Sequence, residues 1–113
     1  INECSVISPK RGLGGIGGSP IKSIALANVF QFSQNTRCDV IGCGGIVNGI
    51  DAFEHILCGA KAVQLGTIVM LESLDIFKKV EVELLEIMRG KGYKKISDFC
   101  GRLKYVHPDL YCN

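Results

Sequence analysis

Two short apolar segments of this chain each end in glycine, and this repeated pattern is the strictest limit on how the chain can fold. Residues 38–49 read CDVIGCGGIVNG and residues 62–67 read AVQLGT, with helical patterns before, between and after them. Buried strands that alternate with amphipathic helices form parallel βαβ units. Because two parallel strands leave sheet faces and edges uncovered, we expect further strands of the same barrel or sheet to complete the fold.

Apolar residues at helical spacing predict a helix on either side of the first segment. The first helix begins near Pro20 and runs to about residue 34. The second begins at Asn48, which forms a variant of the capping box with Asp51, and it ends at Gly59. The inward-facing residues are Ala25, Leu26, Val29, Phe30 and Ser33 in the first helix, and Ala52, Phe53, Ile56 and Leu57 in the second.

The two glycine-ended segments predict buried strands over residues 38–42 and 62–66. A longer helix then opens at Ser73 or Asp75, and a short last helix starts at Ser97. The long helix has two faces. We expect its inward face to carry Ile76, Phe77, Val80, Leu84, Ile87 and Met88, and its solvated face to carry Lys78, Lys79, Glu81, Glu83 and Glu86.

The composition excludes several classes of function. With 113 residues the chain forms one domain at most. Its formal net charge is +2, and basic residues mix with acidic ones along 78–104, so we expect no nucleic-acid partner. No apolar stretch reaches the roughly 18–20 residues that would cross a bilayer, so we expect no membrane partner.

Six cysteines form neither a CxxC pair nor a spacing with paired histidines, so we expect no metal site. Several lie in apolar surroundings, where a thiol behaves as a small hydrophobic group. We therefore favour reduced structural thiols and a cytosolic protein over the alternative of a disulfide framework.

The glycines at the strand ends indicate an anion site. In parallel α/β folds ligands bind at the carboxyl ends of strands, and in TIM barrels the loops after the last two strands hold phosphate. Gly44, Gly45, Gly66 and Thr67 occupy such positions. Backbone amides there can face an anion, the Thr67 hydroxyl can add a hydrogen bond, and the following helix adds its positive end. The alternative is that the glycine pair only makes a tight turn.

A third glycine cluster lies upstream, with five glycines within residues 12–18. Such a segment can be a flexible linker, but Leu13 and Ile16 are unusual in one. We interpret it as an ordered loop that permits a close approach of the backbone to a ligand.

Four segments together carry a resemblance to a known family. They are GLGGIGGSPIKSIALANV (12–29), IGCGGIVNGIDAFEHILCGA (41–60), VQLGT (63–67) and KGYKKISDFCGRLK (91–104). They resemble the last third of a dihydroorotate dehydrogenase of class 1A, the fumarate-using, cytosolic enzymes, from about residue 1 to 104. The sequence departs from that pattern at Ser23 and Ile24, where a Pro–Thr pair is usual.

The resemblance implies an α/β fold, the C-terminal portion of a TIM (β/α)8 barrel, comprising about the last two strands with their helices. It also implies FMN, whose phosphate would contact Gly18, Cys43, Gly44, Gly45, Gly66 and Thr67. Cys43 beside a cofactor resembles a nucleophile or base. In the family the base is a cysteine from the middle of the barrel, so we expect Cys43 to contribute its backbone amide.

The resemblance implies no catalytic residue in this segment, and the residues agree, since none looks like a base ready for proton abstraction. We expect His55 on the outer side of its helix and leave His107 unassigned. The whole chain, 1–113, would be the C-terminal part of one FMN-binding barrel domain. It divides into a hairpin arm (1–11), a barrel segment (12–104) and an unassigned tail (105–113).

The complete enzyme would oxidise (S)-dihydroorotate to orotate through FMN, with fumarate as electron acceptor, in pyrimidine biosynthesis. Its partners would be the preceding polypeptide of the barrel and a second copy in a homodimer in the cytoplasm. Two alternatives remain open at this point. One is another FMN- or phosphate-binding barrel such as a dihydropyrimidine dehydrogenase, and the other is a non-catalytic half-barrel that binds an anion or a partner chain.

Overall fold

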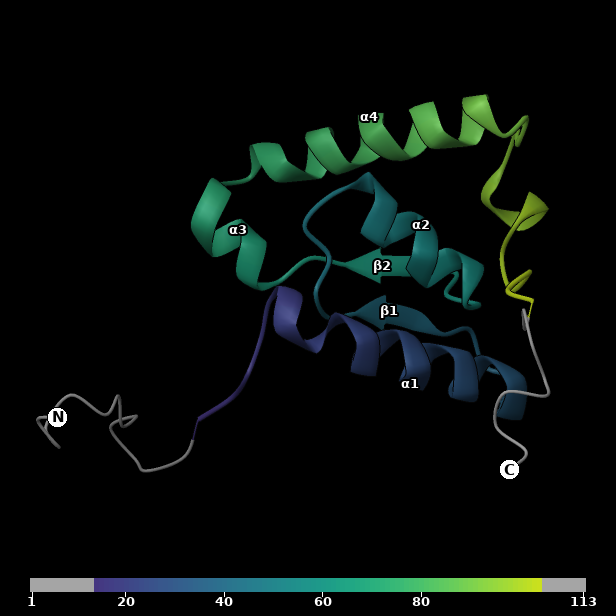
Figure 1. The fold of residues 1–113 in the computed structure, drawn as a ribbon, viewed down its shortest axis with the longest axis horizontal. Coiled ribbons are helices and arrows are strands. Elements are labelled where there is room, and N and C mark those ends of the chain that lie inside the picture. Colours follow the sequence, from purple (N-terminus) through teal and green to yellow (C-terminus); the bar gives the residue numbers. More distant parts are fainter. Residues whose placement is uncertain (1–13, 105–113) are drawn as a thin grey trace, which may run out of the picture.

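The computed structural model describes residues 14–104, and Figure 1 shows how their helices and strands are arranged. The expected hairpin arm and the tail after residue 104 lie outside the described residues. The elements in chain order are η2 (Ser19–Ile21), α1 (Lys22–Asn35), β1 (Ile41–Cys43), α2 (Gly49–Leu57), β2 (Ala62–Gln64), α3 (Thr67–Glu72), α4 (Asp75–Gly90) and η3 (Ile96–Asp98).

The two strands are parallel neighbours, as the βαβ pattern predicts. Ile41 pairs with Ala62, Gly42 with Val63 and Cys43 with Gln64. Both strands are shorter than the predicted ranges 38–42 and 62–66, because only these three pairs meet in register. In Figure 1 α1 runs alongside β1, and α2 lies between the sheet and α4.

One face of this sheet is covered and the other is not. Gly42 is buried against α2, and Val63 packs against the apolar cores around α2 and α4. The residues that alternate with them are exposed: Ile41, Cys43, Ala62 and Gln64. The sequence predicts buried strands together with further strands to cover them, and nothing in the described residues covers the second face. A small α/β unit with two parallel strands and one bare face is consistent with part of a barrel.

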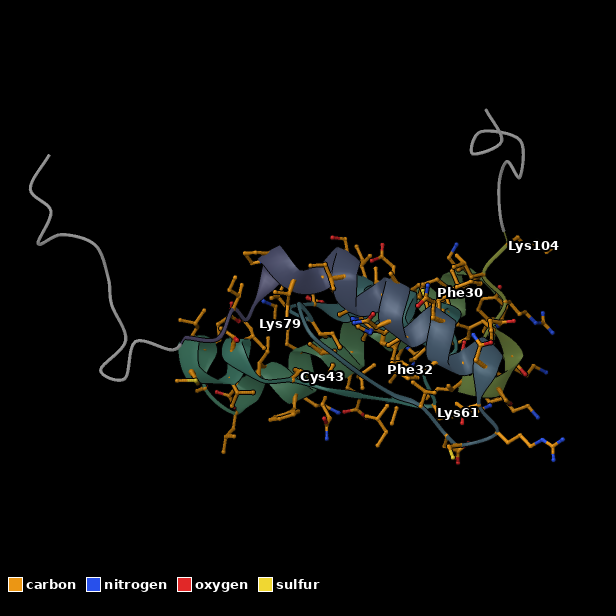
Figure 2. All side chains as sticks on the ribbon, turned by 90° about the horizontal axis from the view of Figure 1, so that it is seen from below. Phe30, Phe32, Cys43, Lys61, Lys79 and Lys104 are labelled. Carbon is orange, nitrogen blue, oxygen red and sulfur yellow. The ribbon has the colours of Figure 1, made fainter. Side chains whose placement is uncertain are left out.

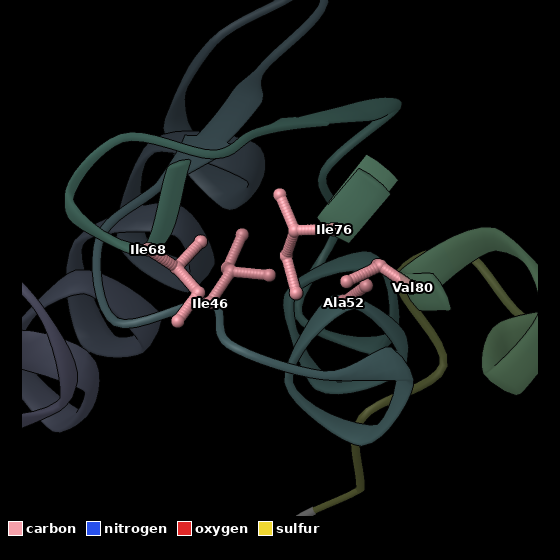
Figure 3. Close-up of a cluster of buried hydrophobic side chains, with 5 residues drawn as sticks. All are labelled: Ile46, Ala52, Ile68, Ile76 and Val80. Carbon is pink, nitrogen blue, oxygen red and sulfur yellow. The ribbon is translucent and has the colours of Figure 1, made fainter. Parts of the chain in front are cut away.

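The central core joins the loops that follow the two strands. Figure 3 shows its buried members Ile46, Ala52, Ile68, Ile76 and Val80. Ile46 belongs to the loop after β1 and Ile68 to α3, which follows β2, while the others come from α2 and α4. Burial of each aliphatic side chain stabilises the fold by roughly 1.5–3 kcal/mol, so both loops are held by the core.

A second core fixes the end of the described chain against α2. The rings of Phe53, Tyr93 and Phe99 stack, with 4.6 Å between the centroids of Phe53 and Phe99. The amide of Gly101 donates to the carbonyl of Ile56 at 3.0 Å. The region after α4 forms η3, which confirms a short last helix near Ser97.

The helix caps follow the predictions in part. Asn48 accepts a hydrogen bond from the Asp51 amide at 2.9 Å, and Gly59 has φ 118°, so the start and end of α2 are confirmed. Asp51 does not complete the capping box, because its carboxylate binds Lys22 and the Val47 amide instead.

The long helix differs from its prediction at two side chains. Phe77 is 48% exposed, although it was expected to face inward. Glu83 was expected on the solvated face, yet it accepts a hydrogen bond from the Gly49 amide at 2.7 Å. The short helix α3 was not predicted at all.

Candidate functional site

A cleft of about 170 Å³ lies where the carboxyl ends of the two strands meet the loop that precedes α1. All six residues expected to contact FMN phosphate line it: Gly18, Cys43, Gly44, Gly45, Gly66 and Thr67. The other lining residues are Gly17, Ile21, Ile46, Gln64 and Ile68. In Figure 2 Cys43, at the carboxyl end of β1, and Lys61, just before β2, mark opposite ends of the sheet.

The upstream glycine loop reaches this cleft and packs against Thr67, the first residue of α3. A Cβ built on Gly17 would stand 2.6 Å from Thr67 Oγ1, and Gly18 has φ 79°. Side chains at these two positions would push the loop away from Thr67 or strain its backbone. The described part of the cluster is therefore an ordered loop, and it brings a third glycine-bearing segment to the cleft.

Gly44 and Gly45 are required by the fold itself. Gly44 has φ 121°, and a Cβ on it would stand 2.8 Å from the Cβ of Ala25. Gly45 has φ 73°, and its Cβ would stand 2.7 Å from the Cα of Lys22. Close packing of α1 and a left-handed backbone thus explain this glycine pair without a ligand.

Gly66 differs from that pair. A Cβ on Gly66 would meet nothing within 4 Å, and its φ is −121°. Over residues 14–104 the amides of Gly45 and Gly66 donate no hydrogen bond to another protein group. The fold therefore leaves open space beside Gly66, and at the cleft it leaves two N–H groups with no acceptor among the described residues.

His55 contradicts the expectation of a surface residue. It is fully buried, and its Nε2 lies 3.0 Å from the carbonyl oxygen of Gly44. A Cβ on Gly42 would stand 2.6 Å from His55 Nδ1, so the glycine in β1 makes room for this ring. The available signal was the helical position three residues after Ala52, which places His55 beside the apolar face.

Burial lowers the pKa of His55 below its ordinary value of 6.5, so the ring is neutral at pH 7. The hydrogen bond with Gly44 and the nearby charges of Asp51 and Glu54 act in the opposite direction, and Lys22 acts in the same direction as burial. A neutral ring that faces a carbonyl oxygen must carry its proton on Nε2, because the oxygen can only accept.

The lysine beside the cleft is already paired. Lys22 Nζ lies 2.5 Å from Asp51 Oδ1 and forms an ion pair with Glu54 Oε2 at 2.6 Å, and these two carboxylates raise the pKa of Lys22. Asp51 also accepts from the Val47 amide at 2.9 Å. This group ties α1, α2 and the loop between β1 and α2 together.

The start of α2 is likewise occupied by protein groups. The amides of Gly49 and Asp51 donate to Glu83 and Asn48, so these two amides of α2 are not free for an anion. The other helix that follows a strand, α3, begins at Thr67, which lines the cleft. An anion in the cleft would meet the loop amides, the hydroxyl of Thr67 and the first turn of α3. Sequence reasoning missed Gln64, which pairs with Cys43 across the sheet and also lines the cleft.

A larger groove of about 360 Å³ lies between α1 and β1, next to the uncovered edge of the sheet. Its lining is mainly apolar and includes Ile24, Phe32 and Ile41, all more than half exposed. Such a surface suits packing against further protein.

Within residues 14–104 the cysteines Cys38, Cys43, Cys58 and Cys100 are free thiols, and no group of acidic, histidine or cysteine side chains could hold a metal ion. None of the helices over the same residues is long and apolar enough to cross a membrane. Cys4 and Cys112 lie outside the described residues.

Comparison with known proteins gives matches in sequence and in structure. The family model described as dihydroorotate dehydrogenase matches residues 2–88. A putative dihydroorotate dehydrogenase A (fumarate) of Streptococcus agalactiae serotype Ia is 53% identical over 107 residues, which cover 93% of this chain. A dihydroorotate dehydrogenase (fumarate) of Kluyveromyces lactis is 51% identical over 106 residues, or 92% of this chain. The chain spans 34% of the length of each.

The crystal structure of a ligand-free DHODH from Eimeria tenella superposes with a TM-score of 0.75 at 30% identity. That match covers 87% of this chain and 28% of the Eimeria chain. The Eimeria enzyme in complex with ferulenol gives a TM-score of 0.74 at 27% identity.

Proposed function

The chain belongs to the dihydroorotate dehydrogenase family, and from this premise we propose that it holds the flavin phosphate in an FMN-dependent, fumarate-using enzyme. One observation carries the proposal: three glycine-bearing loops meet at the carboxyl ends of both strands around a cleft of about 170 Å³. Among the described residues that line the cleft none is charged, so no carboxylate of this part of the chain opposes an anion there.

The residues present fit a phosphate group. The loop amides around Gly18, Gly44, Gly45 and Gly66, with that of Cys43, would donate to its oxygens, and the Thr67 hydroxyl would add a further bond. The open space at Gly66 allows an oxygen to approach the backbone as closely as a hydrogen bond requires. Gln64 lines the same cleft and can donate from its side-chain amide.

We further propose that the rest of a TIM barrel covers the bare face and edges of the sheet. The exposed strand residues would then point into the barrel interior, and Ile24, Phe32 and Ile41 would be buried by the preceding strand and helix. The relatives, about three times longer than the chain, have the length for such a barrel. From the family resemblance we also infer a cytoplasmic homodimer.

Bound FMN would supply the two-electron acceptor for oxidation of (S)-dihydroorotate to orotate, with fumarate as the final acceptor. The role of this chain is then to bind and orient the flavin through its phosphate. We assign no base for proton removal to residues 14–104, since Cys43 would act through its amide and His55 is fully buried against Gly44.

The test uses the natural polypeptide that carries these residues, purified with its bound cofactor. We expect a flavin absorbance spectrum with about one FMN per chain, and reduction of fumarate that depends on dihydroorotate. A protein that binds inorganic phosphate but no flavin, or that oxidises another substrate, would contradict the proposal.

A further inference from the structure

We propose that His55 is a positioning residue: its Nε2–H holds the Gly44 carbonyl and so turns the Gly45 amide toward the phosphate in the cleft. This inference rests on the proposed function. It starts from a fully buried histidine whose Nε2 lies 3.0 Å from the Gly44 oxygen. The ring lies below the cleft and is not among the residues that line it.

The geometry of the peptide bond connects the Gly44 carbonyl, which His55 contacts, with the Gly45 amide. The carbonyl of Gly44 and the amide of Gly45 belong to one planar peptide unit, and in a trans unit they point in opposite directions. A carbonyl held by a ring inside the protein therefore directs the following amide outward. Gly45 lines the cleft, and its amide donates to no other group within residues 14–104.

This peptide unit needs a fixed orientation because glycine flanks it on both sides. Gly44 has φ 121° and Gly45 has φ 73°. Glycine populates both signs of φ about equally, so the unit could rotate and present its carbonyl to the ligand. A carbonyl oxygen facing a phosphate would repel it, whereas the hydrogen bond from His55 favours the orientation that attracts it.

The surroundings show that the fold accommodates this ring at some cost. The middle residue of β1 is Gly42, and a Cβ at this position would stand 2.6 Å from His55 Nδ1. That Nδ1 is buried and has no hydrogen-bond partner among the described residues. An apolar side chain would leave no such unpaired atom. The stabilising contribution of a histidine at this position therefore comes from the hydrogen bond that its Nε2 makes.

Burial is the main cause that keeps the ring of His55 neutral. Asp51 and Glu54 of the same helix and Lys22 of α1 are the charged groups that act on it. The carboxylates of Asp51 and Glu54 are both paired with Lys22. Burial keeps the ring neutral, and its one proton then lies on Nε2. The ring therefore donates to Gly44 and carries no charge of its own to the cleft.

Three variants of the natural flavin-loaded protein test the role. His55→Leu removes the donor, His55→Gln keeps an amide donor at a similar reach, and Ile56→Val is a destabilising control at the neighbouring buried position. We expect the FMN dissociation constant to rise about tenfold in His55→Leu and less than about threefold in His55→Gln, the effect of one hydrogen bond. Ile56→Val should lower the melting temperature without changing the FMN dissociation constant.

A second measurement does not depend on flavin affinity or on the Leu variant folding. Histidine-selective ¹⁵N labelling of the wild type should show the ring of His55 protonated on Nε2 and not on Nδ1. The opposite tautomer, or equal FMN affinity in His55→Leu and Ile56→Val, would overturn the inference while the proposed function stands. A wild type that binds no FMN would overturn both.

Discussion

Glu83 Oε2 accepts a hydrogen bond of 2.7 Å from the backbone amide of Gly49, so α4 caps the first turn of α2. The cap lies directly after the loop that contains Gly44 and Gly45. A side chain 34 residues away in sequence thus helps to fix the start of the helix that follows this loop. The helical pattern alone assigns Glu83 to solvent.

We expect Glu83→Ala to lower the free energy of unfolding by about 1–3 kcal/mol, because it leaves the buried amide of Gly49 without an acceptor. Glu86→Ala, on the exposed side of the same helix, should stay within about 0.5 kcal/mol of wild type. Urea denaturation of the natural protein measures both. Equal losses in the two variants would show that Glu83 is an ordinary surface residue.

We expect Asp51→Asn to destabilise the protein by about 1–3 kcal/mol, because the buried Asp51 carboxylate pairs with Lys22 while also accepting from Val47. The matched control is Glu81→Gln, which breaks the exposed pair with Lys78 and should cost at most about 1 kcal/mol. Thermal unfolding at moderate salt compares them. The prediction fails if the surface variant loses as much stability as Asp51→Asn.

The starts and ends of the helices can be predicted from the sequence, because each depends on a few neighbouring residues. The start of α1 near Pro20, the Asn48 cap and the Gly59 end are each set by a few adjacent residues. The strands are shorter and more exposed than the pattern predicts, because strand length and burial depend on neighbouring strands that the described residues do not include. Phe77, exposed here, was assigned inward by the same pattern.

The sequence predicts the glycines that line the candidate site, but it does not predict the packing contacts that hold them in place. The strand-end rule located Gly44, Gly45, Gly66 and Thr67. It could not separate Gly44, which α1 requires, from Gly66, which no described contact requires, since that difference depends on packing. His55 was misassigned because a helical pattern does not show that the residue opposite is the small Gly42.

Stability should fall as the pH is lowered through the range in which His55 titrates. Its pKa is lowered in the folded state, so below about 6.5 the unfolded chain binds a proton that the folded chain does not. Stability is then full above that pH and decreases below it. His55→Gln should show a shallower loss between pH 7 and pH 5 in urea titrations. Identical slopes in wild type and variant would contradict this assignment.

Residues 1–113 expressed alone should expose apolar surface, because Ile24, Phe32 and Ile41 surround an open groove beside the bare sheet. We expect strong binding of a hydrophobic dye and self-association, and much weaker dye binding by the full natural protein. Sedimentation and dye fluorescence measure these. A monomer with a sharp thermal transition and no dye binding would contradict the partial-barrel interpretation.

The central claim is that a flavin phosphate lies on the backbone beside Gly66, and the ratio of riboflavin to FMN dissociation constants tests it most directly. Riboflavin lacks the phosphate, so the wild-type ratio reports its contribution. Gly66→Ala adds a methyl group in open space at a residue that lines the cleft, and Gly90→Ala makes the same change in open space at the end of α4. We predict that Gly66→Ala lowers the ratio about tenfold or more and that Gly90→Ala leaves it unchanged. A ratio in Gly66→Ala equal to that of wild type would contradict the claim.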